Sequence, residues 1–451
     1  MVASPLPPAA SEARIRSVPW RALRSLGPRL ELPLGAVLAG QAAERVLDRF
    51  LRDHRSLGRD ERTAVAEAIF GVGLWRRRLA WHASVEAPPL ALLAALLRDL
   101  GGVPDAEEIA GLAPGTLPPP RSPPADLALR FSLPDWLAAT LVREAGAEAE
   151  ALADALNVPG PVCLRPNLLR TTPEALAALL ASEGVSTRPG QLVPSALVVT
   201  SARPNVYGLA THREGLFEVQ DEGSQLVADL VGARRGEAVL DLCAGAGGKA
   251  LHLAAAVGST GTVHATDVDA GRLDRLARRA LRAGASAIIR IHGGAPAAHL
   301  LVDRAMVDAP CSELGALRRG PDVRFRLDPF SLERLPASQL ELLARAAGCV
   351  RPGGRLVYAT CTLRREENED VALAFEELHP EFIRQPPWLP RNTTAGPGPE
   401  RPPTGGEVAL GAGRPVLAAV RTPAGFVRTW PHREGCDGFF AAAWRRRDEV
   451  T

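Results

Sequence analysis

The stretch AVLDLCAGAGGK, residues 238–249, decides the fold because it joins a short apolar run to a glycine-rich loop. AVLDLC (Ala238–Cys243) has the length and composition of a buried strand, and the residues after the loop are typical of a helix. Glycines at such a junction allow a tight turn and let a ligand approach the backbone closely. The stretch therefore predicts a strand–loop–helix unit.

The loop by itself leaves three interpretations open. It does not fit a phosphate-binding loop of the form G-x-x-x-x-G-K-[ST], because Cys243 and Ala250 stand at the first and last positions. A nicotinamide site remains open, since Gly245 and Gly247 fit G-x-G-x-x-G and Ala250 is accepted at its third position. An S-adenosylmethionine site also remains possible, in which Asp267 would bind the ribose hydroxyls. The third interpretation is a tight turn that binds nothing.

Lys249 is the only lysine in the chain, so the 53 Lys and Arg residues include 52 arginines. A lysine ammonium is compact and carried on a flexible stem, whereas an arginine guanidinium is a planar fork. Chance would place one lysine somewhere, but a glycine loop at a helix N-terminus is also where a ligand carboxylate would bind. We expect Lys249 to have a specific role there.

Strands and helices alternate from about residue 216 onward. This alternation predicts an α/β fold with a doubly wound parallel sheet, and two C-terminal runs, 415–430 and 438–446, look like an antiparallel hairpin at its edge. In such sheets ligands bind at the carboxyl ends of the strands. The predicted strands are 238–243, 262–267, 287–292, 304–310 and 355–361.

Two cysteines stand at the carboxyl ends of neighbouring predicted strands. Cys311 lies in VDAPCSELG and Cys361 in VYATCT. A lone cysteine is more often a buried apolar filler, and that interpretation is our default for the remaining four. These are Cys163, Cys243, Cys349 and Cys436.

A chemistry that uses two such cysteines is methylation of cytosine at carbon 5. A thiolate that adds to carbon 6 makes carbon 5 nucleophilic enough to take a methyl group from a sulfonium. A carboxyl such as Asp308 would hydrogen-bond to the pyrimidine edge, and a second cysteine would assist release. The base must be reached outside a duplex stack.

Several ordered motifs resemble the Sun/RsmB family of RNA 5-methylcytosine methyltransferases. They are FEVQDEGSQLVADLV, DLCAGAGGK, VDAPCSELGALRRGPDVRFR, VYATCTLRREEN and HREGCDGFF, and the resemblance covers roughly Pro134 to Arg445. It implies a Rossmann-like, S-adenosylmethionine-dependent methyltransferase sheet, with S-adenosylmethionine as cofactor and RNA as substrate.

The resemblance also implies residue roles. Cys361 would be the nucleophile, Cys311 would assist product release, and Asp308 would serve both catalysis and cofactor binding. Asp267 would bind the cofactor ribose. The loop residues that would bind the cofactor are Cys243, Ala244, Gly245, Ala246, Gly247, Gly248 and Lys249.

The sequence departs from the family pattern at two places. Gly245 and Ala246 replace the usual Ala-Pro of the loop, which loosens it. Gly294 stands where the family has an aspartate that contacts the adenine end of the cofactor. The second departure puts cofactor affinity or adenine recognition in question.

We predict three domains. Residues 1–124 form a helical, NusB-like RNA-binding domain that ends in a proline-rich linker at 113–124. Residues 125–215 form a small α/β RNA-binding module, and residues 216–451 the catalytic domain. The arginine-rich stretch Leu317–Arg326 could hold RNA phosphates, or it is an ordinary solvated surface.

Composition limits the remaining possibilities. The net charge of +2 permits nucleic acid as a partner without demanding it. We expect no signal peptide, no transmembrane helix and, from the sparse unpaired cysteines, a reduced cytoplasmic protein without a metal site. We expect a monomer that acts on ribosomal RNA, with transfer RNA left open. The alternatives are a non-catalytic RNA-binding relative in ribosome assembly and an unrelated nicotinamide oxidoreductase.

Overall fold

The computed structural model describes residues 10–201, 204–294, 296, 299–385 and 420–448. The chain divides into two compact units, one of residues 1–159 with 317–329 and the other of residues 160–316 with 330–451. The predicted domain boundaries near residues 124 and 215 stay predictions.

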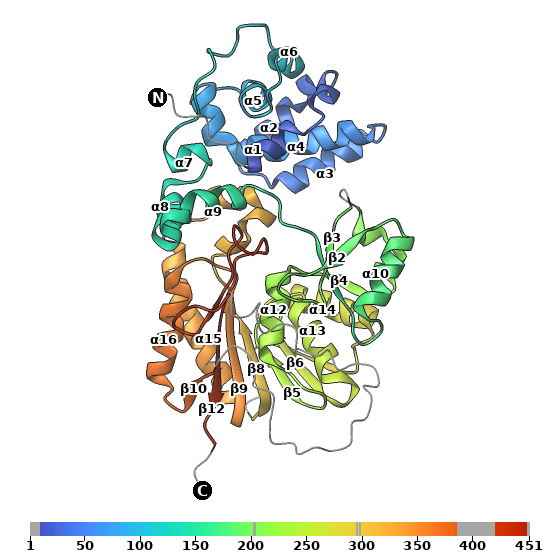
Figure 1. The fold of residues 1–451 in the computed structure, drawn as a ribbon, viewed down its shortest axis with the longest axis vertical. Coiled ribbons are helices and arrows are strands. Elements are labelled where there is room, and N and C mark those ends of the chain that lie inside the picture. The colour runs from blue at the N-terminus through green and yellow to red at the C-terminus, as the bar shows by residue number, and fades with distance from the viewer. Residues whose placement is uncertain (1–9, 202–203, 295, 297–298, 386–419, 449–451) are drawn as a thin grey trace. The chain divides into compact units, whose positions relative to one another are not determined.

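The first unit is helical and is built around one long helix, α4 (Figure 1). The helices predicted at 40–53 and 60–83 correspond to α3 and α4. Many α4 side chains are fully buried, because α2, α3 and α5 all pack against it. The α-helices are α1 (Ala10–Arg16), α2 (Glu31–Leu38), α3 (Ala43–Asp53), α4 (Arg59–His82), α5 (Pro89–Ala95), α6 (Ala106–Ala110), α7 (Leu127–Arg130), α8 (Asp135–Ala145) and α9 (Ala149–Leu156).

A segment from far along the chain completes the helical unit. Residues 317–329 belong to it and carry the short 3-10 helix η8 (Pro321–Phe325). Arg324 is fully buried there and donates to Asn157 Oδ1 at 2.7 Å and to the Leu156 carbonyl at 3.1 Å. Neither interpretation of this stretch, RNA phosphate contacts or a solvated surface, fits Arg324, because its guanidinium is buried and bonded inside the unit.

The second unit begins with a small antiparallel sheet of order β2-β3-β1-β4. Thr172 caps its main helix by accepting a hydrogen bond from the Ala175 N–H, and Pro173 occupies the first helical turn, as favoured at helix starts. The elements are β1 (Cys163–Pro166), α10 (Pro173–Ser182), β2 (Thr187–Pro189), β3 (Leu197–Val199), α11 (Ala210–Arg213) and β4 (Phe217–Val219).

The larger sheet of this unit has the order β10-β12-β9-β8-β5-β6-β7, with β11 paired to β12. β7, β6, β5, β8 and β9 are parallel, whereas β10, β11 and β12 pair antiparallel. The strands are β5 (Ala238–Asp241), β6 (Thr262–Asp267), β7 (Ile289–Gly293), β8 (Val302–Asp308), β9 (Val350–Thr360), β10 (Phe382–Arg384), β11 (Val427–Arg428) and β12 (Phe440–Arg446).

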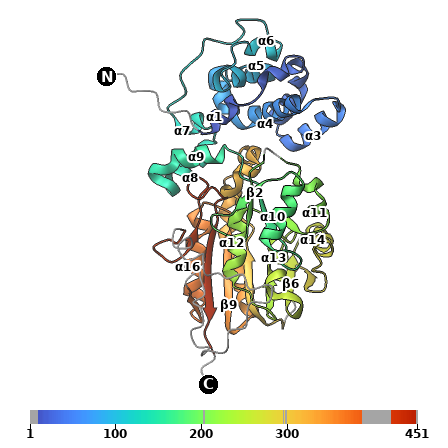
Figure 2. The same cartoon turned by 45° about the vertical axis from the view of Figure 1, so that its right-hand side comes forward.

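Helices cover both faces of this sheet (Figures 1 and 2). Apolar residues of α12, α13 and α14 form one core with the strands, and those of α15 and α16 form the other. This is the Rossmann-like, doubly wound α/β fold that the sequence predicts. The helices are α12 (Glu222–Val231), α13 (Gly248–Val257), α14 (Ala270–Ala283), α15 (Leu335–Cys349) and α16 (Glu369–Leu378).

The predicted antiparallel hairpin at the edge of the sheet corresponds to β11 and β12, and residues 415–419 of its first run lie outside the described residues. β12 pairs with β9 on one side and with β11 and β10 on the other, so β11 and β10 share this edge. β10, which follows α16, was not expected from the sequence. No helix among the described residues is long and apolar enough to cross a membrane.

Candidate active site

The glycine loop lies at the point where the sheet reverses its winding. β5 has β6 on one side and β8 on the other, so the loop after β5 opens at the crevice where ligands bind in such sheets. Gly247 precedes α13 with φ +89°, and a Cβ there would lie 2.1 Å from Leu276 Cδ1, so glycine is required. Around Gly245 and Gly248 a Cβ would meet nothing within 4 Å, which leaves the backbone open to a ligand.

Lys249 lies at the start of α13 and is 9% exposed. Its Nζ donates to Asp308 Oδ2 at 2.6 Å, and the ring of Phe439 lies 5.3 Å away. Burial disfavours the charge of Lys249, but the charge of Asp308 and its hydrogen bond outweigh burial and raise the pKa of Lys249. The lysine therefore joins the loop after β5 to the carboxyl end of β8.

Asp267, at the end of β6, organises the loop from the other side. Its Oδ2 accepts the Gly245 N–H at 2.9 Å and its Oδ1 accepts the Asp269 N–H at 2.8 Å. Gly294 follows β7 with φ +79°, and its N–H donates to the Asp267 carbonyl at 3.0 Å. A side chain at that φ would be strained, which favours glycine at this position.

The two predicted catalytic cysteines meet. Cys311 Sγ lies 3.5 Å from Cys361 Sγ, although 50 residues separate them in the sequence. The contact forms because β8 and β9 are parallel neighbours, so the loops that follow them open at the same edge. Both thiols are free.

The surroundings of Cys361 hold its thiol in the protonated form. The hydrogen bond with Cys311 and then burial, together with the charge of Asp308, raise the pKa of Cys361 well above its ordinary value. These surroundings disfavour the thiolate, which is the reactive form of a cysteine.

Sequence reasoning missed Asp241, the last residue of β5. Its side chain is 1% exposed, and neither carboxyl oxygen has a hydrogen-bond partner among the described residues. Burial and the nearby Asp308 raise the pKa of Asp241 to about 8. An unpaired buried carboxyl at a ligand mouth is expensive unless a ligand pairs with it. The feature of the sequence that could have identified Asp241 is its position just before the glycine loop, near the end of the predicted strand.

Two arginines hold the backbone of the glycine loop, in which Ala246 stands where the family pattern has a proline. Arg279 of α14 donates to the Ala246 carbonyl at 2.7 Å, and Arg165 of β1 donates to the Gly248 carbonyl. Glu218 of β4 holds Arg279 in turn, at 2.9 Å. Burial lowers the pKa of Arg165 to about 10. Neither arginine was identified from the sequence, because nothing in its pattern distinguishes them from surface arginines.

Cys163, Cys349 and Cys436 are buried, as expected of apolar fillers, whereas Cys243 is only partly buried and packs against the core that contains α15 and α16. Burial raises the pKa of Cys243 to about 12, which favours its thiol over the thiolate at neutral pH. No group of residues in the described part of the chain has the makings of a metal site.

The residues present fit S-adenosylmethionine. The open glycine backbone and Lys249 suit a carboxylate, the unpaired Asp241 suits an ammonium group, and Asp267 lies where a ribose would be bound. Together with the sheet order, they define the class of fold as a Rossmann-like, doubly wound sheet of the kind found in methyltransferases, with a ligand site at the carboxyl ends of its strands.

Comparison with known proteins then gives the family. Residues 229–445 match the family described as 16S rRNA methyltransferase RsmB/F, and residues 133–205 match the ferredoxin-like domain of RsmF/B-like methyltransferases. The chain belongs to the RsmB/F family. A probable ribosomal RNA small subunit methyltransferase B of Bacillus subtilis is 31% identical over 327 residues, which are 71% of this chain and 68% of the relative.

Other relatives are matched over less of their length. A protein of the same description from Synechocystis is 35% identical over 57% of this chain, and the match spans 59% of that relative. Among solved structures, a methyltransferase homologue from Pyrococcus horikoshii superposes with a TM-score of 0.56 at 23% identity, covering 71% of this chain and 98% of its own. At this identity the likeness bears on the fold alone.

Proposed function

We propose that this protein methylates carbon 5 of a cytosine in RNA, with S-adenosylmethionine as methyl donor. The observation that carries the proposal is the 3.5 Å contact between Cys311 Sγ and Cys361 Sγ beside the Lys249–Asp308 pair. Two adjacent thiols at a cofactor mouth suit a reaction that forms a covalent bond to the base and later breaks it.

The residues divide the work as follows. When bound, the cofactor supplies a methyl group carried on a sulfonium. Cys361 Sγ, as thiolate, forms a bond to carbon 6 of the cytosine, and the electron pair displaced onto carbon 5 attacks the methyl group. Asp308 holds the pyrimidine edge through the oxygen that Lys249 does not occupy.

Release requires two bonds to break. The proton on carbon 5 leaves to a base, and the pair it leaves behind expels Cys361 as thiolate, which gives 5-methylcytosine. We assign assistance in this step to Cys311, because its sulfur is in contact with the departing one. The surroundings that raise the pKa of Cys361 favour the thiol, so the reaction requires that this thiol loses its proton before it adds to carbon 6.

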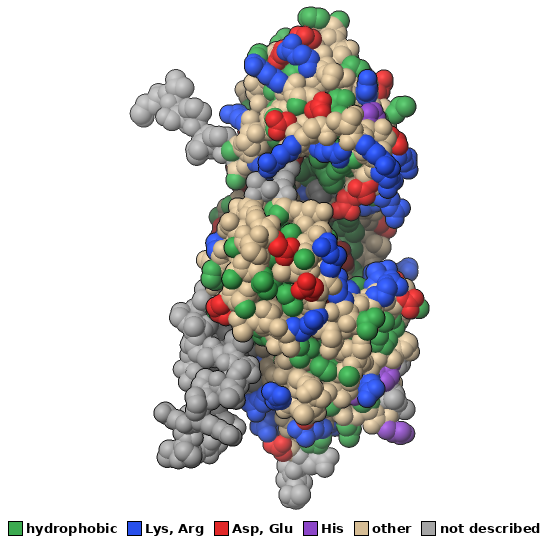
Figure 3. All heavy atoms as spheres, turned by 90° about the vertical axis from the view of Figure 1, so that its right-hand side faces the viewer, with side chains coloured by type: hydrophobic (Ala, Val, Ile, Leu, Met, Phe, Trp, Pro, Cys, Tyr) green, Lys and Arg blue, Asp and Glu red, His purple; other side chains and the backbone are tan. Residues whose placement is uncertain are grey.

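The relatives' names, ribosomal RNA small subunit methyltransferase B, support ribosomal RNA as the substrate class. Basic side chains on the face in Figure 3 lie in several groups among acidic and apolar ones, as expected at a net charge of +2. α14 is one basic element of the second unit, where Arg275 and Arg278 are exposed. It is a candidate contact for phosphates.

Methyl transfer from labelled S-adenosylmethionine to total RNA tests the proposal, with RNA from cells that lack the protein. We expect transfer by the wild type and none by Cys361→Ala. Bisulfite sequencing of the same RNA then identifies the nucleotide. Absence of transfer to any RNA would overturn the proposal.

The roles of the two cysteines are tested separately. Cys311→Ala should accumulate a covalent RNA–protein adduct through Cys361, which a denaturing gel detects as a retarded band. If Cys361→Ala accumulates the adduct instead, the roles are reversed.

A non-catalytic RNA-binding role in ribosome assembly is the second candidate. The observation in its favour is Gly294, which leaves no carboxylate after β7 for the adenine end of the cofactor. Calorimetry with S-adenosylmethionine separates the two, since a non-catalytic relative would bind RNA without binding the cofactor.

A further inference from the structure

A buried carboxylate behind the two cysteines is not used by the proposed reaction. Glu367 ends the 3-10 helix η10 (Arg365–Glu367) and is fully shielded from solvent. It accepts two hydrogen bonds from Ser312, one from the backbone N–H at 2.9 Å and one from Oγ at 2.5 Å. Ser312 directly follows Cys311, so Glu367 fixes the backbone beside that thiol.

The same carboxylate reaches the second cysteine through a relay of hydroxyls. Thr362 directly follows Cys361, and its Oγ1 lies 2.6 Å from Ser312 Oγ. A serine hydroxyl has one proton to donate, and Ser312 donates it to Glu367. Thr362 is therefore the donor to Ser312, and the residues after both cysteines form one directed chain that ends on Glu367.

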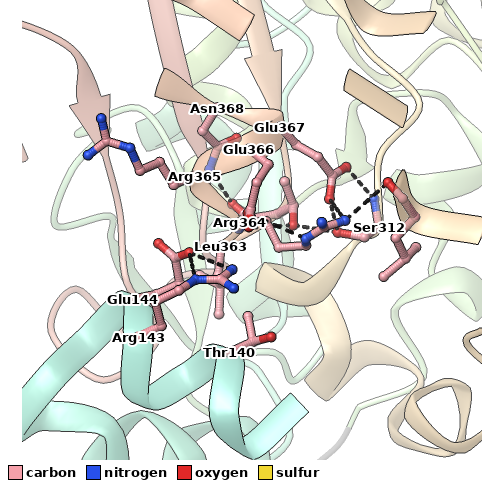
Figure 4. Close-up of polar contacts among 12 residues, drawn as sticks. Thr140, Arg143, Glu144, Ser312, Leu363, Arg364, Arg365, Glu366, Glu367 and Asn368 are labelled. Atoms are coloured by element: carbon pink, nitrogen blue, oxygen red, sulfur yellow. Dashed lines mark hydrogen bonds and ion pairs between the residues drawn. The ribbon is translucent and has the colours of Figure 1, made fainter. Parts of the chain in front are cut away.

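Two further contacts make Glu367 a junction between the loops (Figure 4). Gln339 of α15 donates to Glu367 Oε2 and to the Pro310 carbonyl, both at 3.0 Å, on the side of Cys311. Arg364 Nη1 lies 3.3 Å from Glu367 Oε1, on the side of Cys361. A buried carboxylate is tolerated when its oxygens are satisfied in this way, and it then holds its partners rigidly.

Glu367 cannot itself act on substrate, because no solvent reaches its side chain. The backbone also joins the two loops, since the Gly315 N–H donates to the Cys361 carbonyl at 2.9 Å, and Asn368 Nδ2 donates to the Thr362 carbonyl at 3.1 Å. What Glu367 adds is the side-chain link between the two loops.

We propose that Glu367 is a positioning residue that, through Ser312 and Thr362, sets the distance between Cys311 Sγ and Cys361 Sγ. Its catalytic consequence rests on the proposed function: release of the methylated base, the step that uses both sulfurs, depends on Glu367, whereas cofactor binding does not.

The geometry is tested without RNA or cofactor. A short bifunctional thiol reagent should cross-link Cys311 to Cys361 in the wild type, with the linked peptides identified by mass spectrometry. In Glu367→Gln, which puts an amide where Ser312 needs an acceptor, the cross-linking rate should fall about tenfold. Ser312→Ala cuts the relay while leaving the carboxylate in place, so it should show the same loss and serves if Glu367→Gln does not fold.

Glu366→Gln is the matched control. Glu366 is the preceding residue, is partly exposed and pairs with Arg364 at 3.6 Å. Its cross-linking rate should equal that of the wild type. An unchanged rate in Glu367→Gln, or an equal fall in Glu366→Gln, would overturn the proposal.

Turnover supplies the second readout. We expect Glu367→Gln to lower kcat about tenfold, to raise the amount of trapped RNA adduct and to leave the Kd for S-adenosylmethionine unchanged. An equal loss of cofactor affinity would show a general structural role and would count against positioning. If the wild type transfers no methyl group at all, the proposed function fails, but the cross-linking result still decides the role of Glu367.

Discussion

At the scale of single residues, the site depends on a charged pair, Lys249 and Asp308, whose lysine is buried. Position 249 is a lysine because its compact ammonium group lies 2.6 Å from Asp308 in a nearly closed space beside the ring of Phe439. A guanidinium is larger and planar, so it would not fit without displacing the loop. The sequence pointed to this residue through composition alone, and its position at the loop was correctly expected.

Removing Cys311 should make Cys361 more reactive toward alkylation. The hydrogen bond with Cys311 is the largest cause of the raised pKa of Cys361, so Cys311→Ala lowers that pKa and increases the thiolate fraction at a given pH. Each unit of pKa changes the fraction about tenfold. The rate of iodoacetamide labelling of Cys361 at about pH 8 measures this, read by peptide mass spectrometry. A slower rate than in the wild type would contradict the assigned cause.

Cofactor binding should release a proton near neutral pH. The folded pKa of Asp241, about 8, lies above its ordinary value of 3.8, so the carboxyl is mostly protonated at about pH 7 and is charged above about pH 8. Pairing with an ammonium group favours the charged form and expels the proton. Calorimetry in buffers of different ionisation enthalpy should find close to about one proton released at pH 7 and almost none at pH 9.

Asp241→Asn is the control for this linkage, because it cannot titrate and should release no proton.

The raised pKa of Asp241 also predicts how the stability of the ligand-free protein depends on pH. The raised pKa stabilises the wild type fully below about pH 4, and this contribution is lost as pH rises toward 8. Between about pH 4 and pH 8 the free energy of unfolding of the wild type should therefore fall by more than about 1 kcal/mol relative to that of Asp241→Asn.

At the scale of elements, the small antiparallel sheet and α14 take part in holding the cofactor loop. Replacement of the family's proline by Ala246 would loosen the loop, but Arg279 and Arg165 bind its carbonyls from two different elements. Hydrogen bonds from a charged donor are stronger than neutral ones, so these two contacts help to fix the backbone of the loop. The sequence predicts a looser loop and gives no sign of this support, since the support comes from contacts between distant segments.

Arg165→Met should weaken cofactor binding about tenfold, because the Gly248 carbonyl loses its donor and the loop becomes less ordered. Methionine retains the apolar stem, so the packing of β1 is largely kept. Calorimetry with S-adenosylmethionine measures the change. Arg188→Ala is the control, because Arg188 is an exposed arginine of β2 in the same small sheet and donates to the Pro189 carbonyl. Equal affinity in both variants would mean that β1 does not support the loop.

At the scale of the whole molecule, the helical unit is not one continuous segment of the chain. The helical unit takes in residues 317–329, which lie between the loop of Cys311 and the helix α15 in sequence. Arg324 is its buried anchor, 167 residues away from its partner Asn157. The helical unit is therefore incomplete as a fragment of residues 1–159.

Arg324→Ala should destabilise the helical unit by about 3 kcal/mol, since it leaves buried acceptors without their donor. Hydrogen exchange measured by mass spectrometry should show lower protection in α9 and unchanged protection in β5. Arg326→Ala, an exposed arginine of the same segment, should leave both unchanged. Loss of protection in β5 as well would indicate that the two units unfold together.

The sequence by itself determined the alternation of strands and helices from β5 to β9, the glycine loop and the placing of Cys311 and Cys361 at strand ends. These features are local, because hydrophobic periodicity and turn residues act over a few positions. Tertiary structure decided which charged residues are buried: Asp241, Arg165, Arg324 and Glu367 look like ordinary solvated residues in an arginine-rich chain. Their burial depends on partners from distant segments, and only the folded chain brings those partners within hydrogen-bonding distance.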